Sequence, residues 1–332
     1  MSEERAAAER EQRRREREAR RAQREDATAA PPPAAPPPRP RPAARQRPPR
    51  SGRARIGIAV GLAAIVFGVA AIAALAYRHF HRGAPPPVVV HTIEVTIPEG
   101  YARSQTAALA KREGLRGSYE KASVSSPYLD PARYGGKGAK DLEGFLFPDT
   151  FELERHASAS ALVQRQLEDF KLRIEGIDMG YARSKNLTTY DVLTIASMVE
   201  DEAASEGDRR KVAAVIYNRL HEGMPLGIDA TIRFATRNYS EPLTESELAV
   251  DSPYNTRANA GLPPGPINSP GLAAIEAAAR PARVDYLFYV VEPGACDKLA
   301  FSSTEAEFER DVARYNEARE AAGGNSPDTC GE

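Results

Sequence analysis

The stretch that decides the fold is TTYDVLTIASMVEDEAA, residues Thr188–Ala204. Thr188 and Asp191 have the spacing of a helix-capping arrangement. With 100° per residue, the helix that follows has a broad apolar face formed by Val192, Leu193, Ile195, Ala196, Met198, Val199 and Ala203. Such a face predicts a helix packed into the core of a globular domain.

Three acidic residues follow this apolar run. Asp201 is expected to point away from the apolar face, and Glu200 and Glu202 fall on its two borders. A carboxyl half-embedded among apolar side chains has a raised pKa and can act as a general acid near neutrality. The spacing alone does not choose between Glu200 and Glu202, and an ordinary helix end with solvated acids is the competing interpretation.

The surrounding sequence predicts an α+β fold. Helices are expected over 104–113, 157–174, 206–221, 272–279 and 303–320. Strands are expected over 88–100 and 285–292, and LEGFLFPDTFEL (Leu142–Leu153) is expected to form a strand–turn–strand unit.

A candidate membrane span lies upstream of this domain. It is the run IGIAVGLAAIVFGVAAIAALAY (Ile56–Tyr77), which contains no charged residue. As a helix these residues would extend about 33 Å, enough to cross a bilayer. Seven arginines and no acid lie in the twenty residues before it, whereas only Arg78 and Arg82 follow closely. This asymmetry predicts a cytoplasmic N-terminus, with the rest of the chain on the other side of the plasma membrane. The alternative is a cleaved signal peptide, with Ala74-Leu75-Ala76 as the cleavage site.

Charge and composition narrow the function classes. Residues 1–55 carry 16 arginines against 8 acids, a net charge of +8, so that the remainder carries −9. An acidic outer part argues against nucleic-acid binding there, and the basic tail next to the span suits anionic lipid. Residues 31–50 hold ten prolines, so the tail is expected to be disordered.

Other kinds of active site are not supported by the sequence. There is no HExxH pair, GxSxG elbow or phosphate-binding glycine loop, so neither a metal nor a cofactor is expected. The two cysteines, Cys296 and Cys330, could pair or remain as thiols.

Five segments in fixed order resemble the YceG-like endolytic murein transglycosylases. They are LEGFLFPDTF, IASMVEDEA, VIYNRLHEGMPLGIDATI, SPYNTRANAGLPPGPINSPG and AAARPARVDYLFYVV, and the similarity covers about Ile93 to Tyr315. The resemblance implies the following organisation: a cytoplasmic Arg/Pro-rich tail (1–55), a transmembrane helix (56–77), a linker (78–87), a LysM-like module (88–135), a mainly helical, lysozyme-like catalytic domain (136–322) and a C-terminal tail (323–332).

The resemblance also implies the activity. Such enzymes cleave the MurNAc-β-1,4-GlcNAc bond of nascent peptidoglycan strands and leave a 1,6-anhydro-MurNAc end. It makes Glu202 the catalytic acid/base of an enzyme in the cell inner (plasma) membrane, with an extracytoplasmic catalytic domain and wall-synthesis proteins as further partners. Two departures from the family pattern are Ala203, where a hydroxyl residue is usual, and Asp229-Ala230-Thr231 in place of Asp-Pro-Thr.

The residues expected to bind substrate share turn chemistry or an amide side chain. We expect the following residues to line one cleft with Glu202, the last of them at its edge: Asn218, Asp229, Tyr254, Asn255 and Glu143. Two other functions remain open, a muramidase that hydrolyses the same bond and a non-catalytic peptidoglycan-binding scaffold.

Overall fold

A computed structural model describes residues 67–78, 91–325 and 327 of the chain. The chain divides into two units, residues 1–86 and 87–332. In the first unit residues 67–78 are helical with exposed side chains. None of the helices in the described residues has the length and apolar character needed to cross a bilayer. Residues 56–66 of the expected span, together with the tail of residues 1–55, lie outside the described residues.

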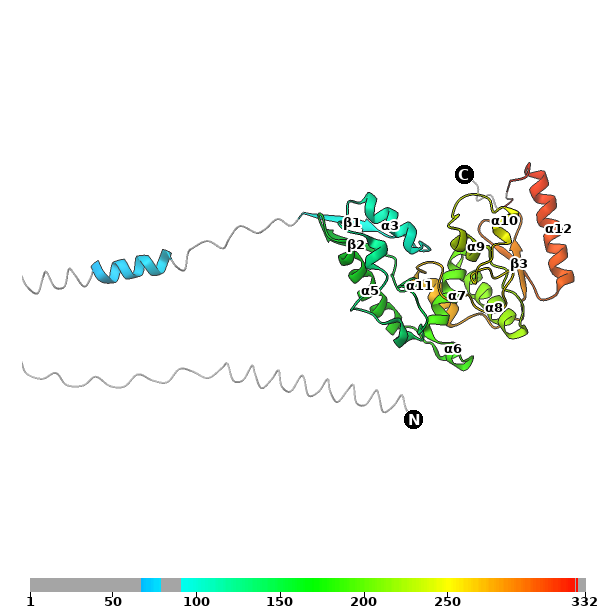
Figure 1. Ribbon diagram of the computed structural model, residues 1–332, viewed down its shortest axis with the longest axis horizontal. Coiled ribbons are helices and arrows are strands. Elements are labelled where there is room, and N and C mark those ends of the chain that lie inside the picture. Colours follow the sequence, from blue (N-terminus) through cyan, green and yellow to red (C-terminus); the bar gives the residue numbers. More distant parts are fainter. Residues whose placement is uncertain (1–66, 79–90, 326, 328–332) are drawn as a thin grey trace, which may run out of the picture. The chain divides into compact units, whose positions relative to one another are not determined.

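The second unit has an α+β fold in which helices predominate (Figure 1). Its described residues contain two small antiparallel sheets, each of two strands. Its elements in chain order are β1 (Thr92–Thr96), α3 (Arg103–Arg112), α4 (Tyr119–Ala122), η1 (Pro131–Tyr134), β2 (Thr150–Glu154), α5 (Ala159–Glu175), α6 (Gly180–Ser184), α7 (Thr189–Glu202), α8 (Glu206–Glu222), α9 (Asp229–Thr236), α10 (Glu245–Leu248), α11 (Leu272–Ala279), β3 (Phe288–Val291), β4 (Leu299–Ser302) and α12 (Glu305–Ala321).

The first sheet joins two parts of the chain that the sequence had suggested were separate. β1 pairs with β2 in the register Thr92 opposite Glu154 and Thr96 opposite Thr150. The strand that completes this sheet therefore lies beyond residue 135, the expected end of the small module. In the described structure, residues 88–135 do not form a sheet by themselves.

The LEGFLFPDTFEL segment differs from its prediction. Only its second half is a strand, β2, whereas the first half forms turns. Gly144 has φ +82°, the left-handed region, which ends any extended run there. Leu142, Phe145 and Leu146 are nevertheless fully buried, so the apolar run that suggested a strand serves the core instead.

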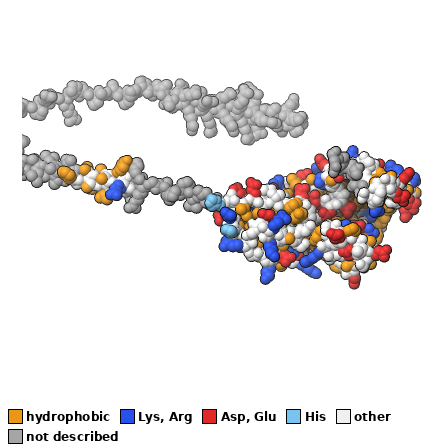
Figure 2. Space-filling model, turned by 90° about the horizontal axis from the view of Figure 1, so that it is seen from above, with side chains coloured by type: hydrophobic (Ala, Val, Ile, Leu, Met, Phe, Trp, Pro, Cys, Tyr) orange, Lys and Arg blue, Asp and Glu red, His pale blue; other side chains and the backbone are white. Residues whose placement is uncertain are grey.

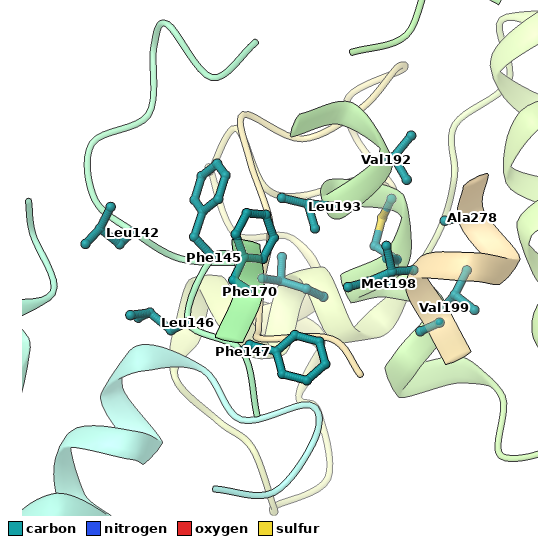
Figure 3. Close-up of a cluster of buried hydrophobic side chains, with 14 of the residues drawn as sticks. Leu142, Phe145, Leu146, Phe147, Phe170, Val192, Leu193, Met198, Val199 and Ala278 are labelled. Atoms are coloured by element: carbon teal, nitrogen blue, oxygen red, sulfur yellow. The ribbon is translucent and has the colours of Figure 1, made fainter. Parts of the chain in front are cut away.

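The core surrounds α7 (Figure 3). Phe145 packs edge-on against Phe170 of α5, with ring centroids 5.2 Å apart, and stacks on Tyr190 of α7 at 5.7 Å. On the other side α7 packs against α8 and α11. Eight consecutive residues of α7, from Val192 to Val199, are buried. A helix buried on nearly all sides is a rigid support for the acids at its C-terminal end.

Most of the helices lie where the sequence predicted them, with ends displaced by a few residues. The sequence analysis did not predict β4, the eight-residue helix α9 or the shorter helices α4, η1, α6 and α10. β4 pairs with β3, and Tyr289 lies opposite Phe301. This second sheet brings Tyr289 beside the end of α7, as the hydrogen bond described below shows.

Candidate active site

Glu202 is the last residue of α7, and the helix ends immediately after it. Ala203 has extended backbone angles, φ −142° and ψ 119°. At the start of the helix, Thr188 and Asp191 form the predicted capping box. The helix is therefore fixed at both ends, and its last side chain leaves the helix beside the sheet formed by β3 and β4.

The Glu202 carboxyl is in an environment suited to proton transfer. The Tyr289 hydroxyl donates a hydrogen bond of 3.0 Å to Glu202 Oε2. The pKa of Glu202 is raised to about 7, chiefly by burial, against the lowering effect of the Tyr289 hydrogen bond and with a smaller raising effect from the nearby negative charge of Asp229. A carboxyl with this pKa holds its proton about half the time at neutral pH and can both give and take one.

Glu202 opens onto a cavity of about 280 Å³. Two further carboxyl residues, Asp201 and Asp229, line the same cavity. The Asn268 amide donates a hydrogen bond of 2.9 Å to Asp201 Oδ2. Asp201 is exposed, in keeping with the expectation that it points away from the apolar face of the helix, and the Asn268 amide holds its carboxylate at the cavity wall.

Glu200 has a different task. Its Oε2 accepts a hydrogen bond of 2.8 Å from the backbone N–H of Gly271, the residue that precedes α11. Its Oε1 lies 4.0 Å from Arg209 Nη2. Glu200 thus anchors the N-terminus of α11 and does not line the Glu202 cavity. Of the two glutamates between which sequence spacing could not choose, Glu202 lines the cavity and Glu200 holds the loop at Gly271.

Asp229 stands at the first position of α9 on the wall of the same cavity. Its Oδ1 accepts two hydrogen bonds from Arg257, of 2.8 Å from Nε and 2.7 Å from Nη2. The guanidinium fixes the direction of this carboxylate. Of the residues expected to share a cleft with Glu202, Asp229 is the one that lines its cavity.

Two asparagines do not lie where the sequence analysis expected them. The Asn218 amide donates to the carbonyls of Val284 and Tyr286, at 3.0 and 2.8 Å. Asn255 is 1% exposed and donates to the carbonyls of Leu248 and Val250. Neither lines the Glu202 cavity, because each amide is used to close a backbone loop.

Glu143 and Tyr254 line a neighbouring cavity of about 570 Å³. Glu143 is buried, and its two oxygens accept the backbone N–H of Arg103 at 3.2 and 3.0 Å. Burial raises the pKa of Glu143 to about 8, although the Arg103 N–H lowers it. Tyr254 packs on Phe234, with ring centroids 4.8 Å apart.

The structure identifies site residues that the sequence analysis missed. Tyr289 is one, and Tyr239, Gln105 and Asn268 of the cavity walls are others. Asn268 belongs to one of the five segments that carry the family resemblance, but nothing in the sequence linked it to Asp201. Within the described residues no group of three or more His, Cys, Asp or Glu side chains could hold a metal ion. Cys296 is not a free thiol, and Cys330 lies outside the described residues.

Comparison with known proteins identifies relatives of this chain. The model of the YceG-like family matches residues 71–314. An endolytic murein transglycosylase of Bacillus subtilis (strain 168) is 34% identical over 180 residues, 54% of this chain and 47% of that protein. One from Streptococcus pneumoniae (strain R6) is 30% identical over 249 residues, 67% of this chain and 44% of that protein.

A solved structure extends the likeness to the fold. The crystal structure of a YceG-like protein from Listeria monocytogenes superposes with a TM-score of 0.58 at 30% identity, and covers 65% of this chain and 75% of that one. The aligned segments span less than half the length of the two transglycosylases. With a family model that matches most of its length, this chain belongs to the YceG-like family.

Proposed function

We propose that this protein is an endolytic murein transglycosylase that cuts the β-1,4 bond between N-acetylmuramic acid and N-acetylglucosamine in nascent glycan strands. The observation that carries the proposal is Glu202, a carboxyl with a pKa of about 7 on the wall of a cavity, held by a hydrogen bond from Tyr289. The names of the relatives support the substrate and the type of cleavage.

The first step of the proposed reaction is proton donation. Protonated Glu202 gives its proton to the glycosidic oxygen, so that the bond to the departing N-acetylglucosamine can break. The pKa of about 7 leaves a large fraction of the carboxyl protonated at neutral pH. Asp229, whose negative charge raises the pKa of Glu202, increases that fraction.

The second step returns the proton to Glu202. As a carboxylate, Glu202 removes the proton of the muramoyl C6 hydroxyl, and the C6 oxygen attacks C1 to close a 1,6-anhydro ring. The attacking oxygen belongs to the substrate, so a single carboxyl can serve both steps, and an intramolecular nucleophile has a large advantage in effective concentration. Carboxylates Asp201 and Asp229 in the same cavity favour one alternative, a muramidase in which one of them activates water.

The anchor and the small module are part of the same proposal. The uncharged run from Ile56 to Tyr77 and the arginines before it support a single span with the N-terminus in the cytoplasm. The catalytic unit would then lie outside the inner membrane, next to newly made glycan strands and the proteins that synthesise them. The family resemblance supports a LysM-like module at the start of this unit, with the sheet of that module completed by β2, beyond residue 135. A fluorescent reporter active only in the cytoplasm should be bright before Met1 and dark after Glu332, and the reverse pattern would contradict this topology.

The test of the activity is a pair of matched substitutions on one helix. Glu202→Gln keeps the shape of the side chain but cannot exchange a proton, so cleavage should fall by about 10²–10⁴-fold. Glu200→Gln keeps an acceptor for the Gly271 N–H outside the cavity and should retain activity. Full activity of Glu202→Gln would refute the assignment.

Mass spectrometry of the wild-type products distinguishes the two reactions. Transglycosylase products end in 1,6-anhydro-muramoyl residues and are lighter by one water than the reducing ends left by a muramidase. Reducing ends in the wild-type digest would favour the hydrolytic alternative. Absence of any cleavage by a folded wild-type protein would favour a binding role.

A further inference from the structure

The larger cavity beside the Glu202 site has no part in the two chemical steps, and its walls come from distant parts of the chain. α3 and α4 contribute Arg103, Ser104 and Lys121. The Leu142–Phe147 turns contribute Glu143, while α9 and the loop before α11 contribute Phe234 and Tyr254. The cavity therefore lies where the first helices of this unit face its catalytic part.

The two cavities are neighbours, because Phe234 and Tyr239 line both. Tyr239 is close to carboxyl groups of both cavities. Burial raises the pKa of its hydroxyl most, and the negative charges of Glu143 and of Asp201 raise it as well. Its hydroxyl lies 3.2 Å from Ser104 Oγ of α3, which ties the dividing wall to the first helices. A chain-like ligand that occupies the Glu202 cavity can thus continue past Phe234 and Tyr239 into the larger one.

The chemistry of the larger cavity suits a sugar better than an ion. Its walls mix three carboxyl with three basic side chains, and even with Glu143 protonated the net charge is only about +1, too small to select for a strongly charged ligand. The surface of the unit is similarly mixed, with positive and negative side chains interspersed on the face shown in Figure 2. Tyr254 and Phe234 supply adjoining aromatic rings on which the apolar face of a pyranose can pack.

Glu143 supplies the polar contact that a sugar needs. It is 7% exposed, and its carboxyl group interacts with two backbone N–H groups, those of Arg103 and Gly144. A carboxyl group has more lone pairs than these two donors use. Its unused capacity on the cavity wall can accept hydrogen bonds from sugar hydroxyl groups.

We propose that the larger cavity is a binding subsite for neutral sugar residues of the same glycan strand, beyond those at the cleaved bond. This inference rests on the proposed function and deepens it. A strand that fills both cavities is also bound through sugars distant from its scissile bond. Such binding favours long strands over short fragments, and it favours cleavage within the strand. The first helices of the unit, α3 and α4, then contribute to the preference for long glycan strands.

Binding to an inactive background tests the subsite without relying on turnover. The parent is the full chain carrying Glu202→Gln, and the probes are peptide-free, uncrosslinked murein glycan strands of graded length, from the disaccharide upward, measured by isothermal titration. Affinity of the parent should rise with length. Adding Tyr254→Ala should weaken binding of the longer strands by about tenfold, equivalent to about 1.4 kcal/mol, and so flatten the dependence on length.

Two further variants serve as controls. Tyr254→Phe keeps the aromatic face and should bind long strands like the parent, which separates stacking from damage to the fold. Tyr128→Ala removes an exposed ring that lines neither cavity and should also bind like the parent. Thermal unfolding of each variant shows whether a loss reflects folding.

The outcomes separate this inference from the activity on which it rests. If the parent binds long strands more tightly than the disaccharide and folded Tyr254→Ala does so equally well, the subsite is refuted while the proposed function stands. If the parent binds strands of all lengths equally, the second cavity is not used and the subsite is again refuted. If the wild-type protein neither binds nor cleaves any strand, the proposed function itself fails, and the subsite fails with it.

Discussion

Tyr289→Phe removes one hydroxyl group from the candidate active site and little else. The ring stays in place on β3, where it lies 6.1 Å from the Phe301 ring. What is lost is the donor of the 3.0 Å hydrogen bond to Glu202 Oε2. Because the hydrogen bond favours the carboxylate form, its removal should raise the pKa of Glu202 above its present value of about 7.

The size of the effect follows from the energy of that hydrogen bond. A hydrogen bond to a charged group contributes about 1.5–3 kcal/mol, and water that reaches a partly exposed carboxylate replaces some of it. If the net loss of hydrogen-bond energy is about 1.5 kcal/mol, the pKa of Glu202 should rise by about one unit, because one pKa unit corresponds to about 1.4 kcal/mol. The carboxyl also becomes less well oriented.

The assay is the pH dependence of kcat/KM on glycan strands, because this quantity reports the pKa values of the free enzyme. Glu202 must be protonated to act as the acid, so activity falls as pH rises through its pKa. In Tyr289→Phe this alkaline limb should move up by about one pH unit. The plateau at lower pH should fall by about three- to tenfold, because the carboxyl is held less firmly. Carbon-13 NMR of labelled glutamate gives the same pKa without turnover.

The matched control is Tyr286→Phe, the same change three residues earlier on a tyrosine that lines neither cavity. It should leave both the plateau and the alkaline limb in place. An unchanged profile in Tyr289→Phe, or a limb displaced to lower pH, would refute the reasoning that Tyr289 stabilises the carboxylate of Glu202.

Three further predictions concern the scaffold of the site. Phe145→Ala removes a fully buried ring that packs on Phe170 and should cost about 3–5 kcal/mol in the free energy of unfolding, measured with urea; a loss below about 1 kcal/mol would contradict its central place in the core. Gly144→Ala places a Cβ against the Pro266 ring at a positive φ and should destabilise by more than about 1 kcal/mol, seen as a lower midpoint of thermal unfolding, unless that turn rearranges freely. Asn218→Ala leaves two carbonyls without their donor and should cost about 1–3 kcal/mol in unfolding experiments while kcat/KM per folded molecule stays unchanged, and a selective loss of activity would return Asn218 to the substrate site.

The sequence by itself determined the helical framework, because apolar periodicity and capping residues are local signals. α7 shows this best: the capping box at Thr188, the buried face and the acids at its end could all be read from one short stretch. The order of five motifs also indicated the family. In LEGFLFPDTFEL the same reasoning failed for the first half, since burial and a strand produce similar apolar runs and the turn at Gly144 decides between them.

Only the tertiary structure decided which acid faces the cavity and what surrounds it. Glu200 and Glu202 have equivalent positions on the borders of the helix, and they differ because Glu200 meets the Gly271 N–H while Glu202 meets the Tyr289 hydroxyl. Those partners are 71 and 87 residues away along the chain. Amide side chains carry the same ambiguity. Asn218 closes a backbone loop and Asn268 holds Asp201 in the cavity wall, because the partner of an amide is set by which segments fold against it and not by its neighbours in sequence.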